Sequence, residues 1–114
     1  MGMIRTSIIA SVTAAASASA EDLNLSCKGE NWSLELNDQS AELIFPSPTQ
    51  MDVMLDTPAE GHEWPRALTL VGDRDSGVLI LDQRQCGSHD IAAELLTQRG
   101  QTPIFVIGCC SVRE

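Results

Sequence analysis

The amino-acid sequence predicts an all-β fold: a small antiparallel β-barrel or sandwich of about seven or eight short strands, stapled by two disulfides. Three observations support this prediction. Apolar and polar residues alternate in short stretches, turn residues separate these stretches, and the 114-residue chain contains four cysteines. A period of two places successive side chains on opposite faces of a strand, so one face of each stretch can be buried.

The first half of the chain contains four stretches with this alternation. In the second of them, Trp32 and Leu34 share one face, and in the fourth Met51, Val53 and Leu55 share one face. Turn residues, including glycine and proline, follow each stretch. Strands are therefore expected at residues 23–27, 32–36, 41–45 and 51–55.

The second half of the chain is also rich in strand signals, with one ambiguous stretch at 89–100. Residues 91–99 have a helix-forming composition, and Gly100 would suit the end of a helix. The segment 98–101 can instead form a hairpin turn, with Pro103 after it. We favour the hairpin and keep a short helix as the alternative. The remaining strands are expected at residues 67–71, 78–82 and 104–107.

The first twenty residues have the layout of a secretory signal peptide. Arg5 supplies a positive charge, an uncharged stretch continues to Ala16, and small residues end the segment at Ala20. We expect residues 1–20 to be removed during export. One domain, residues 21–114, then remains in the periplasm or is secreted, and without a cysteine at its start we expect no stable membrane anchor.

All four cysteines, Cys27, Cys86, Cys109 and Cys110, lie in the expected exported domain. An even number of cysteines in a small exported domain predicts two disulfides. A bridge between the adjacent Cys109 and Cys110 would strain the intervening peptide and ranks last. On a strand these two side chains point to opposite faces, so one can reach Cys27 and the other Cys86. The sequence leaves open which of them pairs with which.

The expected exported domain is strongly acidic. It holds all sixteen Asp and Glu residues and six of the seven Lys and Arg residues, a net charge of about −10. Such a domain repels nucleic acid and attracts basic proteins. Solubility alone is the simpler explanation of the charge. We expect a monomer with no nucleic-acid partner and with a basic protein as its candidate partner.

The sequence carries no signature of an active site or a metal site. Ser88-His89-Asp90 has the residue types of a catalytic triad, but adjacent residues do not converge as a triad requires. Neither His62 nor His89 lies in a metal-ligand motif, and Met51 and Met54 would point to opposite faces of one strand. We expect no catalytic residues, no enzymatic activity, no metal and no cofactor.

Three residues in predicted loops are speculative binding residues: Trp64, His89 and Asp90. Trp64 is one of only four aromatic residues in the chain. It either covers the open end of a barrel, which we favour, or stands exposed as an anchor for a partner. His89 and Asp90 belong to a polar turn that follows Cys86.

Two segments resemble small uncharacterised bacterial envelope proteins. The segment Cys27-Lys28-Gly29-Glu30-Asn31-Trp32 is similar to the Cys…Gly…Glu-Pro-x-Trp opening of that family, although the proline is missing. Cys86 follows as the family's central cysteine does, and Gly108-Cys109-Cys110 is similar to its ending. The resemblance implies a small periplasmic β-barrel with disulfide-paired terminal cysteines and no established activity. In size, charge and architecture the chain is also similar to periplasmic inhibitors of lysozyme, an analogy at the level of the fold.

The sequence thus predicts a non-enzymatic binding or inhibitory module directed against a basic protein such as lysozyme. Two alternatives remain. One is a barrel that holds a small apolar ligand in its mouth. The other is a structural or stress protein of the cell envelope.

Overall fold

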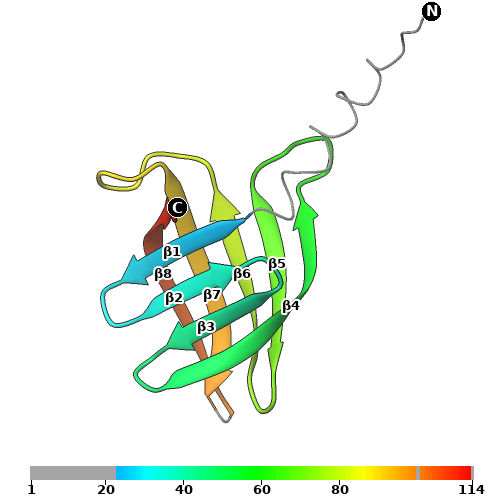
Figure 1. The fold of residues 1–114 in the computed structure, drawn as a ribbon, viewed down its shortest axis with the longest axis vertical. Coiled ribbons are helices and arrows are strands. Elements are labelled where there is room, and N and C mark those ends of the chain that lie inside the picture. The colour runs from blue at the N-terminus through cyan, green and yellow to red at the C-terminus, as the bar shows by residue number, and fades with distance from the viewer. Residues whose placement is uncertain (1–22, 100, 114) are drawn as a thin grey trace, which may run out of the picture.

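The structure is a computed structural model that describes residues 23–99 and 101–113. The expected signal peptide, residues 1–20, lies outside the described residues. The described chain forms eight antiparallel strands that follow one another around a closed barrel (Figure 1). The prediction of an all-β fold is confirmed, and of the two architectures considered the barrel is the one that forms.

Each strand pairs with the next along the chain, and β8 pairs back with β1 to close the sheet. The ambiguous stretch forms strand β7, so the favoured hairpin with β8 is confirmed and the helix is not formed. The strands are β1 (Asn24–Gly29), β2 (Ser33–Asn37), β3 (Ser40–Ile44), β4 (Pro48–Pro58), β5 (Arg66–Gly72), β6 (Ser76–Asp82), β7 (Ile91–Arg99) and β8 (Thr102–Val112).

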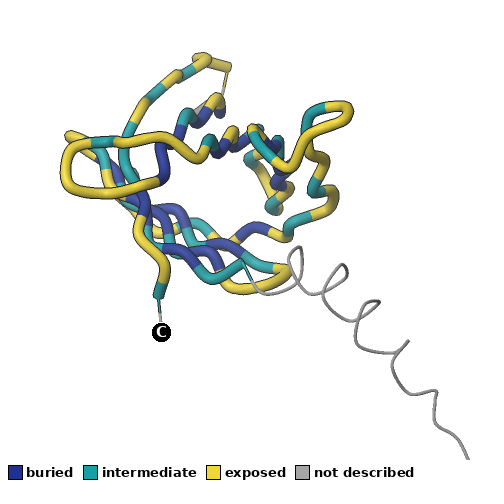
Figure 2. The backbone as a smooth tube through the Cα atoms, turned by 90° about the horizontal axis from the view of Figure 1, so that it is seen from above, coloured by how far each residue is buried: buried dark blue, intermediate teal, exposed yellow. Residues whose placement is uncertain are grey.

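Leucine side chains dominate the interior of the barrel. Leu34, Leu36, Leu70, Leu79 and Leu95 have no exposed surface. Buried and more exposed residues alternate along the strands around the ring, as the period of two predicts (Figure 2). Each leucine removed from water contributes about 1.5–3 kcal/mol. These side chains make the interior a packed core.

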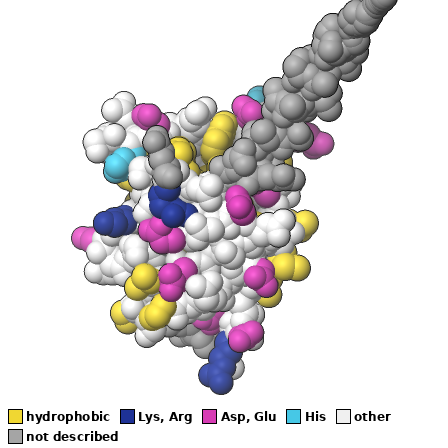
Figure 3. Space-filling view, viewed as in Figure 1, with side chains coloured by type: hydrophobic (Ala, Val, Ile, Leu, Met, Phe, Trp, Pro, Cys, Tyr) yellow, Lys and Arg dark blue, Asp and Glu magenta, His cyan; other side chains and the backbone are white. Residues whose placement is uncertain are grey.

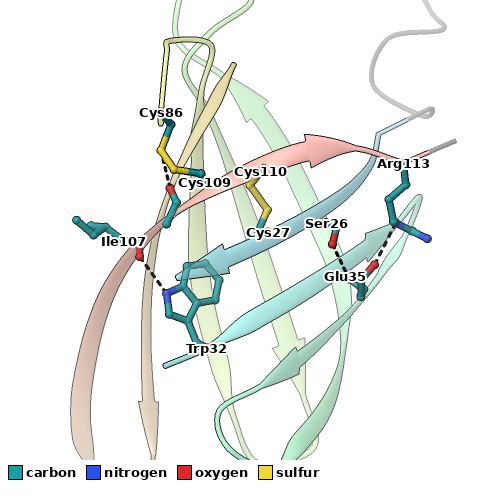
Figure 4. Close-up of a disulfide and its surroundings, with 10 residues drawn as sticks. Ser26, Cys27, Trp32, Glu35, Cys86, Ile107, Cys109, Cys110 and Arg113 are labelled. Atoms are coloured by element: carbon teal, nitrogen blue, oxygen red, sulfur yellow. Dashed lines mark hydrogen bonds and ion pairs between the residues drawn. A yellow bond between two sulfur atoms is a disulfide. The ribbon is translucent and has the colours of Figure 1, made fainter. Parts of the chain in front are cut away.

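The pairing of β1 with β8, which we call the seam, brings together the two segments that resemble the envelope family. Gly29 lies opposite Gly108, and Cys27 lies opposite Cys110. The Trp32 indole packs over both glycines and donates a hydrogen bond of 3.0 Å to the carbonyl of Ile107 (Figure 4). A Cβ atom on either glycine would overlap its surroundings, the Trp32 ring included. The segments around Gly29 and Gly108 therefore pack against each other and against Trp32 at the seam.

The two expected disulfides are present, and the structure decides their pairing. Cys27 bonds to Cys110 inside the barrel, across the seam, with 4.0 Å between the Cα atoms. Cys86 bonds to Cys109 on the outside and ties the β6–β7 connection to β8 (Figure 4). Because Cys109 and Cys110 are neighbours on a strand, one points outward and the other inward.

The expectation that Leu55 shares a buried face with Met51 and Val53 is wrong. The pairing of β4 with β5 shifts by one residue between Val53 and Leu55. Such a β-bulge reverses the alternation of side chains beyond it. Leu55 consequently is 62% exposed, and Asp56 takes the inward position opposite Leu68.

Candidate binding site at the barrel mouth

Three connections lie at the same end of the barrel, which we call the mouth. They join β2 to β3, β4 to β5 and β6 to β7, and antiparallel neighbours place alternate connections at one end. The structure thereby brings the three speculative binding residues, Trp64, His89 and Asp90, to the mouth. They lie there on two different connections, at residues 59–65 and 83–90.

An open hollow of about 1080 Å³ lies at the mouth, between the β2–β3 turn and the second half of β4. The backbone amide of Val53 donates a hydrogen bond of 2.8 Å to the carbonyl of Gln39, which fixes the turn against β4. Beyond this contact β4 leaves β3 and pairs with β5 alone, so its side chains border the hollow. The lining residues are Leu23, Asn37, Asp38, Gln39, Ser40, Asp52, Val53, Met54, Leu55, Asp56 and Leu68.

The hollow combines carboxylates with apolar surface. Asp38 and Asp52 are exposed, and neither forms an ion pair with any residue that the structure describes. Met54 and Leu55, displaced outward around the bulge, add exposed apolar side chains beside them. A lysine or arginine side chain has an apolar stem and a charged tip, so it matches this combination.

The third carboxylate of the hollow, Asp56, is already paired. Arg66 Nε and Nη2 donate hydrogen bonds of 3.0 Å and 2.8 Å to the two Asp56 oxygens. The Arg66 guanidinium carbon also lies 5.5 Å from the centre of the Trp64 ring. Arg66 is only 5% exposed, and the planar two-point pairing gives its buried guanidinium an oppositely charged partner.

Trp64 lies in the covering position that the sequence favoured, because its half-buried ring packs against the core beneath the mouth. Sequence reasoning missed its two companions, Asp56 and Arg66. Only the bulge in β4 turns Asp56 inward, and no residue pattern in the sequence indicates that bulge.

His89 and Asp90 are exposed on the β6–β7 connection. Cys86 and His89 exchange backbone hydrogen bonds of 2.8 Å and 2.9 Å, which form a tight turn next to the Cys86–Cys109 disulfide. Met51 is buried and Met54 is exposed, so the two methionines do not share a site. Within residues 23–99 and 101–113, no group of three or more His, Cys, Asp and Glu residues could hold a metal ion.

The outer wall over β1 to β4 is polar, with the carboxylates of Glu35 and Glu42 at its centre. Ser26, Glu35, Glu42 and Gln50 lie directly opposite one another across these four strands. Ser26 donates a hydrogen bond of 2.7 Å to Glu35, and Arg113 lies 3.1 Å from the other Glu35 oxygen (Figure 4). Asp and Glu side chains are spread over the face seen in Figure 3, with few basic side chains among them.

A comparison with models of protein families, with curated proteins and with solved structures finds no match at a significant level. The geometry alone therefore defines the class: a small eight-stranded antiparallel barrel with two disulfides. Two such bonds are consistent with an oxidising compartment. In the described part of the chain no helix has the length and hydrophobicity to cross a membrane.

Proposed function

We propose that this protein is a non-enzymatic binding module, located in the periplasm or secreted, whose mouth binds a basic protein. The observation that supports this best is the hollow, where Asp38 and Asp52 lie beside Met54 and Leu55. No described residue forms an ion pair with either carboxylate. Binding would place a Lys or Arg side chain of the partner between the β2–β3 turn and β4.

The charge of the whole chain supports the same proposal. Its formal net charge is −9 at pH 7, and Glu35 and Glu42 lie side by side on the outer wall of β2 and β3. Complementary charge accelerates the encounter of two proteins and weakens with added salt. A c-type lysozyme is a concrete basic partner, and a module bound over its substrate cleft would act as an inhibitor.

The alternative function, binding of a small apolar ligand at the mouth, is supported by fewer residues. The side chains of Leu23, Val53 and Leu68 give the hollow an apolar floor, although carboxylates and the polar turn surround it. A retained small molecule in native mass spectrometry of the purified protein would favour this alternative.

The proposal is tested by titrating the purified protein with a c-type lysozyme. We expect a complex at an ionic strength of about 0.01 M that weakens strongly at about 0.15 M, where screening shortens the Debye length from about 30 Å to about 8 Å. The double variant Asp38→Asn/Asp52→Asn should weaken binding about tenfold or more, as loss of a central charge contact does.

The matched control is Asp73→Asn/Asp75→Asn, in the β5–β6 turn at the opposite end of the barrel. It changes the net charge by the same amount and should lower the affinity only slightly. Absence of a complex at low salt, or equal losses in the two double variants, would refute binding of this basic protein at the mouth.

A further inference from the structure

The outer surface of β6, β7 and β8 is apolar, in contrast to the polar wall of β1 to β4. Val78, Leu96 and Phe105 lie directly opposite one another across these three strands. In the adjacent row Ile80 and Ile107 flank Glu94. We call the surface formed by Val78, Ile80, Leu96, Phe105 and Ile107 the outer apolar face.

Four of these side chains are exposed to solvent, and Val78 is half-buried. Leu96 is 49% exposed, Phe105 60% and Ile107 66%. Single exposed apolar residues are common, but adjacent ones on one face mark a site of interaction. Phe105 adds an aromatic side chain, the type enriched among residues that dominate binding energy.

A second, smaller hollow of about 310 Å³ borders the outer apolar face. Val78 and Leu96 belong to both, and Thr69, Gln98 and Pro103 are among the other residues that line it. An apolar side chain of a partner can enter this hollow while the flatter part of the face covers its neighbours.

Glu94 defines the charge that a partner must carry. Its half-buried side chain lies between Ile80 and Ile107, and no described residue forms an ion pair with it. A partner that covered the apolar neighbours without providing a cation would remove water from this carboxylate and leave it unpaired, at a considerable cost.

We propose that the outer apolar face docks a second protein through an amphipathic segment in which apolar side chains surround a Lys or Arg. The apolar side chains would cover Leu96, Phe105 and Ile107, and the cation would meet Glu94. A second copy of this chain fits less well, because face-to-face pairing brings two acidic molecules together and two Glu94 side chains into the same interface. This surface lies on the barrel wall, so the inference goes beyond binding at the mouth.

The test uses three synthetic peptides with one helical pattern: Leu with Lys, Leu with Glu, and Ser with Lys. We expect only the Leu/Lys peptide to shift the methyl NMR signals of Ile80, Leu96 and Ile107. The variants Phe105→Ser and Ile107→Ser should each weaken its binding about tenfold. Glu94→Gln should weaken it and reduce its dependence on salt.

Val112→Ser is the matched control, because Val112 lies on the same strand as Phe105 and Ile107, is 64% exposed and lies outside the face. It should bind the Leu/Lys peptide like the original protein. In Asp38→Asn/Asp52→Asn, which tests the mouth separately, the peptide should still shift the methyl signals of Ile80, Leu96 and Ile107. An unchanged circular dichroism spectrum shows that each variant is folded. If either Phe105→Ser or Ile107→Ser fails to fold, the other variant still tests the face.

Methyl shifts confined to Leu23, Leu55 and Leu68 at the mouth, or equal binding of all three peptides, would overturn the inference. So would sedimentation of the protein alone as a dimer that Phe105→Ser dissociates, since the face would then be covered by a second copy.

Discussion

Asp56 and Arg66 form a buried ion pair in the barrel. Almost none of the surface of Arg66 is exposed, so its guanidinium needs partners within the protein. Two hydrogen bonds to Asp56 and the nearby Trp64 ring compensate for the water that it lost. The pair lies at the mouth of the barrel, and losing either partner would leave the other charge buried without a counter-charge.

Removing Asp56 alone should be far worse than removing the pair. We expect Asp56→Ala to lower the free energy of unfolding by about 3–5 kcal/mol, and Asp56→Leu/Arg66→Met to leave it nearly unchanged, because only the single change leaves a buried charge unpaired. Denaturant unfolding with intact disulfides measures both. Asp82→Ala, which breaks the exposed pair with Arg84 at 3.4 Å, is the control and should cost at most about 1 kcal/mol. Equal losses in the Asp56 single and double variants would contradict the expectation.

Among the elements, the strands were predictable and their partners were not. The alternation in segments such as 32–36 is local, so it identifies strands and even the buried Trp32 from the sequence. The bulge in β4 depends on how β4 pairs with β5, which no local pattern records. For this reason the alternation placed Leu55 on the same face as Met51 and Val53 and missed the inward turn of Asp56.

The candidate site was less predictable than the fold. Trp64 was identified because a tryptophan in a polar loop stands out, but the hollow joins the β2–β3 turn to β4, two segments whose contact follows from the closed sheet. The outer apolar face is likewise formed by three strands in one register, so its rows become visible only once β6, β7 and β8 are paired.

The bulge can be tested with two neighbouring substitutions on β4. Val53→Ser should cost about 1–3 kcal/mol of stability, because Val53 packs against the core. Leu55→Ser should change stability by no more than about 0.5 kcal/mol, because Leu55 lies beyond the bulge and faces solvent. Thermal or denaturant unfolding measures both losses of stability. If the alternation continued without a bulge, Val53→Ser and Leu55→Ser would destabilise the protein equally.

For the molecule as a whole, the two disulfides differ in reach and in accessibility. Cys27 and Cys110 are 83 residues apart and buried, whereas Cys86 and Cys109 are 23 residues apart and half-buried. Restriction of the unfolded chain gives stabilisations of ~4.5 and ~3.4 kcal/mol for loops of these lengths. The first bond holds the barrel closed, and the second holds one connection of the mouth.

Mild reduction should therefore open the Cys86–Cys109 bond first and leave the barrel folded. Alkylation followed by mass spectrometry of peptides identifies which thiols are released. We expect Cys86→Ala/Cys109→Ala to remain folded and Cys27→Ala/Cys110→Ala to lose more stability, since it also removes two buried sulfur atoms. Simultaneous release of all four thiols under mild conditions would show that the two bonds do not open independently.

The seam also determines when the barrel can close during synthesis. Of the described strands β1 is made first and its neighbour β8 last, so the β1 edge of a growing chain stays unpaired until β8 has emerged. During that interval Cys86 is the first thiol that Cys27 can meet. A Cys27–Cys86 bond is consequently the non-native disulfide that competes with the native pairing, and a thiol isomerase would have to rearrange it. Intermediates with this bond should accumulate when synthesis pauses before Cys109 is made.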